Sequence, residues 1–232
     1  MSHIKYYPEL EQGSDEWLQA RCGILTASEM KLILTPTLKV TSNEKERTHL
    51  FELLSQRISQ YVDPVFIGFN GDRGHQEEVL AKIKYIEHVA PIQDMGFITN
   101  DKYGFTIGYS PDGLVGDDGL VECKSRVQKY QVQTIAELEV PEEHVFQLQT
   151  GLIVSERKWI DYISYCGGHL MCVLRVFPDL VIQEAIINAA IKFEQRLQLK
   201  WEQYKDVVNN KKAILIPTER TKIEQEIIIW RI

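Results

Sequence analysis

Two short apolar segments around a glycine-rich turn constrain the fold of this chain more than any other stretch. Residues 103–109 alternate in the manner of a strand, and residues 119–124 do so again after the Gly-Asp-Asp-Gly sequence at 116–119. A period of two predicts β-strands, and glycine with aspartate between them predicts a hairpin. Glu122 and Lys124 lie two positions apart on the second strand, so both side chains leave the same face.

Carboxylates mark this predicted hairpin as a candidate metal site. Asp112, within Ser-Pro-Asp-Gly, precedes the turn, and Glu122 follows it. Mg²⁺ prefers oxygen ligands and usually takes one or two protein carboxylates, with water and phosphate in its other positions. The Cys123 side chain points into a core, but its backbone carbonyl is a plausible third ligand. An isolated Glu-x-Lys would favour a solvated surface hairpin; the Pro-Asp-Gly sequence and the apolar flanks favour a site for Mg²⁺-assisted cleavage of a phosphodiester.

The wider sequence resembles a known nuclease family. The hairpin is similar to the PD-(D/E)xK nuclease superfamily, and blocks between about residues 12 and 166 resemble, in order, those of the lambda-exonuclease (YqaJ-type viral recombinase) family. These blocks are residues 12–29, 74–85, 110–124 and 144–149, the last followed by the segment that contains Trp159. The order of several blocks is more specific than any single one.

The resemblance implies an α/β fold of the PD-(D/E)xK restriction-endonuclease-like type, with a central mixed β-sheet flanked by helices. The chain has 232 residues, enough for a substantial core, and shows no linker, repeat or low-complexity tract. We therefore expect one nuclease domain over residues 1–232, with its core motifs at about 12–166 and a C-terminal helix and tail at 178–232.

Further catalytic residues follow from the resemblance. In residues 74–90, predicted to be helical, Glu78 follows Gly74 at +4 and matches the family's additional acid, which would join the metal directly or through water. Gln147 matches a glutamine near the family's active site, in a helix that opens after Pro141. Lys124 would orient or help deprotonate the attacking water. We expect Mg²⁺, replaceable by Mn²⁺, with a second ion ~4 Å from the first.

An anion site is predicted near the N-terminus. Ser14 is a good N-cap for a helix whose face carries Trp17 and Arg21, and Thr26 opens a capping box. Helix N-termini attract anions, and guanidinium and hydroxyl groups bind phosphate. The family resemblance implies that Arg21, Thr26 and Ser28 form the pocket for a terminal 5′-phosphate. Possible further DNA contacts are Trp17, Arg126 and Lys129.

The rest of the chain informs the architecture more than the chemistry. Residues 159–165 and 171–177 are predicted strands, and residues 180–204 form an amphipathic helix with one apolar stripe. The apolar stretches 213–217 and 227–229 pack either on the domain or against another subunit; the sequence does not choose between these.

Charge and cysteine content restrict the functional classes. The formal net charge of −7 is unusual for a nucleic-acid-binding protein, so DNA binding would need a locally basic channel in an acidic protein. The four cysteines form no CxxC pair and no regular spacing, which favours reduced core thiols over an iron–sulfur cluster. No apolar signal region or membrane span is present in the sequence, so we expect a soluble cytoplasmic protein, in the bacterial host cytoplasm if phage-encoded.

The family resemblance implies a specific activity. It implies a Mg²⁺-dependent 5′→3′ exonuclease on double-stranded DNA ends that releases 5′-mononucleotides and leaves a 3′ single-stranded tail. It also implies a homotrimer that works with a single-strand annealing protein in phage-type recombination. The alternatives are a structure-specific or restriction-type endonuclease on the same scaffold and, with less support, a DNA-end-binding module that does not cut.

Overall fold

The computed structural model describes residues 2–63 and 69–220 and shows a mixed α/β fold. The strands are β1 (Ile4–Tyr7), β2 (Leu25–Thr26), β3 (Phe97–Asn100), β4 (Ile107–Tyr109), β5 (Gly113–Val115), β6 (Gly119–Ser125), β7 (Trp159–Tyr165) and β8 (Cys172–Val176). The helices are α1 (Asp15–Ala20), the 3₁₀ turn η1 (Ala27–Glu29), α2 (Met30–Ile33), α3 (Glu44–Ser59), α4 (Phe69–His88), α5 (Gln128–Glu137), α6 (Glu142–Ser155) and α7 (Leu180–Asn209).

The strands form two mixed sheets of four strands each. The first has the order β1-β3-β4-β2, in which β2 and β4 are parallel, and the second has the order β5-β6-β7-β8, in which β6 and β7 are parallel. The predicted α/β class with mixed pairing is therefore confirmed, although the strands are divided between two sheets. Residues 110–112 connect β4 of the first sheet to β5 of the second.

The predicted hairpin forms, but with a different first strand. Strand β6 pairs antiparallel with residues 113–115, and only Ile107–Tyr109 of the predicted strand 103–109 is extended, as β4 in the other sheet. The cause is a turn at Gly104, which has φ +86° and whose N–H donates to the Asp101 carbonyl at 3.2 Å. A left-handed backbone of this kind suits glycine and interrupts the strand.

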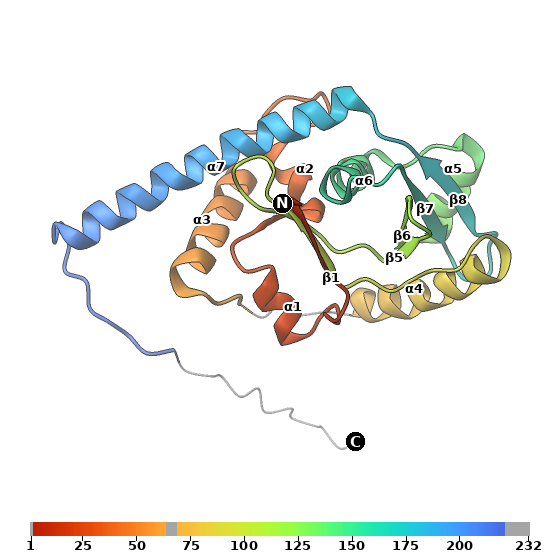
Figure 1. Cartoon of the computed structure of the whole chain (residues 1–232), viewed down its shortest axis with the longest axis horizontal. Helices are drawn as coiled ribbons and strands as arrows, with labels where there is room; N and C mark the ends of the chain where they lie inside the picture. Colours follow the sequence, from red (N-terminus) through yellow and green to blue (C-terminus); the bar gives the residue numbers. More distant parts are fainter. Residues whose placement is uncertain (1, 64–68, 221–232) are drawn as a thin grey trace, which may run out of the picture.

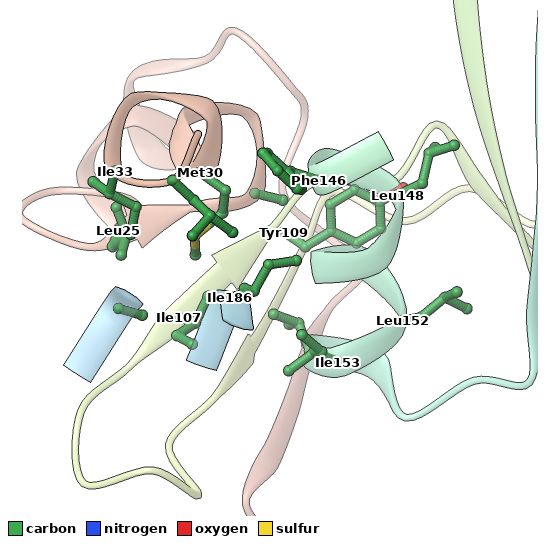
Figure 2. Close-up of a cluster of buried hydrophobic side chains, with 14 of the residues drawn as sticks. Leu25, Met30, Ile33, Ile107, Tyr109, Phe146, Leu148, Leu152, Ile153 and Ile186 are labelled. Atoms are coloured by element: carbon green, nitrogen blue, oxygen red, sulfur yellow. The ribbon is translucent and has the colours of Figure 1, made fainter. Parts of the chain in front are cut away.

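Helix α6 lies between the two sheets (Figure 1). Residues 148–155 are all buried, so this helix is enclosed on every side, as expected for one that is apolar almost all round. It packs against β3 and β4 of the first sheet and β7 of the second. Figure 2 shows Leu152 and Ile153 of α6 in the same cluster as Ile107 of β4. The predicted helix after Pro141 is confirmed, with the proline at the N-cap.

Helix α4 covers the opposite face of the second sheet. Its Ala81 and Tyr85 are fully buried in a separate cluster with Val121 and Cys123 of β6. The helix predicted for residues 74–90 is thus confirmed, and it begins earlier, at Phe69. The alternation along β6 places Cys123 toward α4, on the face away from Glu122, as the sequence predicted.

The strands predicted at 159–165 and 171–177 and the helix predicted at 180–204 are also confirmed, as β7, β8 and α7. Helix α7 runs along the upper edge of the molecule in Figure 1, across α2 and α3, and buries Phe193 and Leu197. Beyond it, Ile214 and Ile216 are exposed, whereas residues 227–229 lie outside the described residues. None of the described helices is long and apolar enough to cross a membrane.

Candidate active site

One cavity contains both groups of residues that the sequence predicted separately. Its walls come from α1, η1, the connection between β4 and β5, strand β6 and helix α6. It is lined by Gln12, Trp17, Arg21, Thr26, Ala27, Ser28, Tyr109, Ser110, Asp112, Glu122, Lys124 and Gln147. The predicted metal carboxylates and the predicted phosphate ligands therefore face the same space, although residues 21 and 122 are far apart in the sequence.

Glu122 is held by donors from three elements. Its Oε2 accepts from the Tyr109 hydroxyl at 2.7 Å, and its Oε1 accepts from Lys124 Nζ at 2.7 Å and Gln147 Nε2 at 2.6 Å. The carboxylate is only 2% exposed, so these bonds replace its lost hydration. The prediction that Glu122 and Lys124 share a face is confirmed. Gln147, which the resemblance had placed near the active site, bonds directly to Glu122.

Asp112 directly precedes β5, the first strand of the second sheet, and lies beside Glu122. Its Oδ2 accepts from the Cys123 backbone N–H at 2.5 Å. Burial, and then the charges of Glu122 and Glu78, raise the pKa of Asp112 well above its usual range. A cation near Asp112 and Glu122 would relieve this repulsion, and their oxygens are the ligands that Mg²⁺ prefers. The residues present therefore suit the divalent metal that the sequence predicted.

Glu78 lies beside the carboxylate pair and not within it. It lines an adjoining groove together with Asp112, and Lys82 Nζ lies 3.2 Å from its Oε1. Its neighbour Glu77 instead accepts a short hydrogen bond from Ser125. Among the described residues, no three His, Cys, Asp or Glu side chains gather in a metal-holding arrangement. The contact of Glu78 with a metal, directly or through water, stays a prediction.

The neighbouring carboxylates determine the charge state of Lys124. Burial alone would lower its pKa, but the nearby carboxylates of Glu122 and Asp112 outweigh burial and raise the pKa above its ordinary value. The protein's own groups therefore favour the charged form of Lys124. Lys124 is an ammonium that donates to Glu122, which supports a charge-offsetting role more than a role as base.

The cysteines take no part in this cavity through their side chains. All four are outside disulfides, and the Cys123 thiol is buried on the α4 face. Burial raises the pKa of Cys123 well above its usual range, with further contributions from Asp112 and Glu78. The predicted core position holds for Cys123 and Cys166, whereas Cys22 and Cys172 are only partly buried. The role of the Cys123 carbonyl stays a prediction.

Arg21 forms the basic end of the cavity. Its guanidinium stacks over the Trp17 ring at 4.1 Å and donates to Ser110 Oγ at 3.2 Å and Thr26 Oγ1 at 3.3 Å. Burial lowers its pKa, and the charge of Glu29 partly opposes this. Within the part of the chain that the structure describes, no carboxylate lies within ion-pair distance of Arg21. A partly buried guanidinium whose hydrogen-bond partners among the described residues are hydroxyls is suited to receive an anion.

Thr26 and Ser28 lie beside Arg21, but helix geometry contributes less than the sequence suggested. The helix expected after Thr26 is the three-residue turn η1 followed by the four-residue α2, too short for a substantial dipole. The Thr26 hydroxyl donates to Glu29 Oε2 at 2.8 Å, and Ser28 Oγ lies 3.3 Å from Thr26 Oγ1. Arg21 and Ser28 are therefore the donors best placed for an anion.

Trp17 stacks against the Arg21 guanidinium, and Ser110 holds both side chains by hydrogen bonds. The indole Nε1 donates to Ser110 Oγ at 2.9 Å, the same atom that receives Arg21. The predicted DNA contact of Trp17 stays untested, since the structure shows it positioning a guanidinium. Sequence analysis missed Tyr109 and Ser110. Their position next to Asp112 was visible, but their contacts arise only from tertiary folding.

Arg126 and Lys129 do not line this cavity. Arg126 bonds to Glu143 at 2.9 Å and to His144 at 3.2 Å, and both Arg126 and Lys129 lie over the Tyr130 ring. Burial, followed by the charge of Lys124, lowers the pKa of His144 to about 4. His144 is therefore neutral at pH 7. The proposed DNA contacts of Arg126 and Lys129 remain predictions.

The mixed α/β fold of the chain is of the kind found in PD-(D/E)xK nucleases. The model of the YqaJ-like viral recombinase domain matches residues 16–158, which is more than half of the 232 residues. The chain therefore belongs to the YqaJ-like viral recombinase family, as its motifs predicted. None of the curated proteins matches it significantly.

Solved structures support the same fold. The alkaline exonuclease LHK-Exo from Laribacter hongkongensis is 26% identical, with a TM-score of 0.75, and the alignment covers 85% of this chain and 100% of that one. LHK-Exo in complex with dAMP gives a TM-score of 0.76 at the same identity and coverage. The alignment therefore covers the whole of that exonuclease and most of this chain.

Proposed function

We propose that this chain is a divalent-metal-dependent DNA exonuclease. Its family membership and its likeness to an alkaline exonuclease support DNA exonuclease chemistry. The observation that carries the proposal is the single cavity in which Asp112 and Glu122 face Arg21. Hydrolysis of a phosphodiester needs the metal-binding carboxylates Asp112 and Glu122. An exonuclease also needs a group that recognises the end of the strand, and Arg21 is suited to that task.

We further propose 5′→3′ polarity on double-stranded ends. Arg21 and Ser28 would bind the terminal 5′-phosphate, with Thr26 accepting from Arg21 and holding it in place. The first phosphodiester would then lie near the carboxylates, so each cycle would release one 5′-mononucleotide and leave a growing 3′ tail. The partly buried guanidinium of Arg21, whose hydrogen-bond partners among the described residues are hydroxyls, supports this direction of entry.

The proposed mechanism assigns each residue one task. Asp112 and Glu122 would hold Mg²⁺ or Mn²⁺, one ion or two, with the Cys123 carbonyl as a further ligand and Glu78 contributing through water. When bound, the metal would supply Lewis-acid stabilisation of charge on the phosphate. Lys124 would orient the attacking water and offset negative charge in the transition state. Gln147 would fix Glu122 by its 2.6 Å hydrogen bond.

The cellular context follows from the family as a further proposal. We infer a homotrimer that encloses DNA, a single-strand annealing protein as its partner, and action in phage-type recombination in the cytoplasm. A sedimentation measurement tests the trimer: sedimentation of the full chain as a monomer at all concentrations would exclude the ring.

Digestion of defined DNA substrates tests the proposed activity. Linear duplexes with 5′-phosphate or 5′-hydroxyl ends and a covalently closed circular duplex are incubated with Mg²⁺, and parallel samples contain a chelator. We expect mononucleotide release from the 5′-phosphorylated linear duplex, slower release from the hydroxyl form and none from the circle or with chelator.

Other results of this digestion would support one of the alternative functions. Cleavage of the closed circle would identify an endonuclease on the same scaffold. Retention of DNA ends without nucleotide release, with or without Mg²⁺, would identify a binding module. Release from 3′ ends would contradict the proposed polarity while leaving the nuclease assignment intact.

A further inference from the structure

Tyr109 connects the hydrophobic core to the candidate metal carboxylate. The residue ends β4 and is 1% exposed, with its ring in the large core cluster that also contains Phe146 and Leu148. Figure 2 shows this ring beside α6, among apolar side chains. Its hydroxyl nevertheless donates to Glu122 Oε2 at 2.7 Å. One end of this side chain is therefore fixed by packing and the other reaches the site.

A glycine on α6 provides the space for this ring. A Cβ atom at Gly151 would lie 2.7 Å from Tyr109 Cε1 and 2.8 Å from its Cζ, closer than any normal carbon contact. Glycine inside a helix usually destabilises it relative to alanine, by about 0.5–1 kcal/mol. Since Gly151 lies within a buried helix, its presence is explained by the approach of Tyr109. The space next to Gly151 is thus filled by the Tyr109 ring.

The three donors to Glu122 differ in how firmly they are held. Lys124 lies on the same strand, and its long side chain has several rotatable bonds. Gln147 is partly exposed on α6. Tyr109 has a rigid ring enclosed by the core and is the sole donor to Oε2 among the described residues. The carboxylate plane of Glu122 is therefore defined most firmly by Tyr109.

We propose that Tyr109 is a positioning residue that orients Glu122 for divalent-metal binding, with Gly151 providing the space for its ring. The proposal rests on the proposed role of Glu122 as a metal ligand. Hydrogen-bond partners behind a ligand typically change metal affinity or activity by about 10- to 100-fold when they are removed. Tyr109 acts through Glu122 and does not itself contact substrate.

The variant Tyr109→Phe separates this role from core packing, because phenylalanine keeps the ring and removes only the hydroxyl. Mn²⁺ binding to the protein without DNA is measured by electron paramagnetic resonance, and nucleotide release is measured across Mg²⁺ concentrations. We expect affinity for Mn²⁺ to fall about 10-fold or more and kcat to fall, with KM for 5′-phosphorylated ends unchanged.

Tyr85→Phe is the matched control. Tyr85 is equally buried, in the cluster that α4 forms with β6. Its hydroxyl donates at 2.6 Å to a different carboxylate, that of Asp161. This variant should lower the melting temperature without changing Mn²⁺ affinity. If both variants changed stability alike and neither changed Mn²⁺ binding, Tyr109 would be only a core residue and the inference would be overturned.

A second pair of variants tests the space at Gly151. Gly151→Ala should displace the Tyr109 ring and weaken Mn²⁺ binding, whereas Gly74→Ala, where an added Cβ meets nothing within 4 Å, should not. Unchanged Mn²⁺ binding in a folded Gly151→Ala protein would contradict the role of Gly151 in making space for the Tyr109 ring.

The wild-type protein separates failure of this inference from failure of the proposed function. A wild-type chain that binds no Mn²⁺ and releases no nucleotide would overturn the proposed function as well. An active wild type together with an unaffected Tyr109→Phe variant would overturn only this inference.

Discussion

The two ends of the cavity carry opposite charges and are built in different ways. The acidic end is formed by Asp112 and Glu122, which are close in the sequence and joined by the hairpin of β5 and β6. The basic end depends on Arg21, which is held by residues from other parts of the chain, including Ser110. A local hairpin can provide metal chemistry, whereas recognition of a strand end requires long-range assembly. The variants below test whether cleavage at the acidic end and recognition of the strand end at the basic end can be lost independently.

The largest effect should come from Asp112→Asn. The substitution keeps the shape of the side chain but removes the charge, so the metal ligand and its stabilisation of several kcal/mol are lost. We expect nucleotide release to fall by a factor on the order of 10⁴ or more. Binding of 5′-phosphorylated ends, measured by fluorescence anisotropy, should be retained. Loss of end binding together with cleavage would show that the two ends of the cavity are not separable.

Lys124→Ala should have the next largest effect. It removes the ammonium that donates to Glu122 and offsets transition-state charge, so single-turnover cleavage should slow by about 10²- to 10⁴-fold. Selectivity for 5′-phosphate over 5′-hydroxyl ends should be unchanged, since Arg21 is intact. A wild-type rate in this variant would remove Lys124 from the mechanism.

Arg21→Ala should affect recognition more than chemistry. Hydrogen bonds to a charged group contribute about 1.5–3 kcal/mol, so the preference for 5′-phosphorylated ends should fall by about 10- to 100-fold. Cleavage of 5′-hydroxyl ends should change little, and the measurement is kcat/KM on the two substrates. An unchanged preference would mean that the phosphate pocket lies elsewhere.

The smallest effect on activity should come from Arg57→Ala, which acts on the scaffold of the basic end. Arg57 donates to both carboxylate oxygens of Glu194 on α7, at 2.8 and 2.7 Å, and to the carbonyl of Gly23, two residues after Arg21. We expect the free energy of unfolding to fall by about 2 kcal/mol, measured by urea denaturation. Selectivity for 5′-phosphate should fall only a few-fold, and the rate on 5′-hydroxyl ends should stay unchanged. A slower cleavage of 5′-hydroxyl ends would show that the contacts of Arg57 also support the acidic end of the cavity.

Local patterns predicted much of the fold. The period of two along β6 and the apolar run of β7 gave these strands correctly, because the alternation of side chains follows directly from strand geometry. The apolar stripe of α7 and the Ser14 cap of α1 were equally local signals, and Ser14 does accept from Trp17 N–H. The error at residues 103–109 arose because Gly104 reverses the chain within a segment that still alternates.

The candidate site was predicted only in part. Asp112, Glu122 and Lys124 could be identified because their spacing on a hairpin fixes their mutual positions. The bond of Gln147 to Glu122 could not be derived, since it depends on where α6 packs between the two sheets. The direction in which the pKa of Lys124 is shifted could not be derived either, because the number of carboxylates around this lysine is a property of the folded chain.

The sequence by itself determined which groups are present and which local geometry each one has: a pair of carboxylates on a hairpin, and an arginine at the end of a capped helix. Only the tertiary structure decided that these groups share one cavity. It also placed Tyr109 behind Glu122 and gave Gly151 the role of making room for it. The physical reason is that strand and helix periods fix neighbours a few residues apart, whereas contacts between distant segments depend on how the two sheets and α6 pack together.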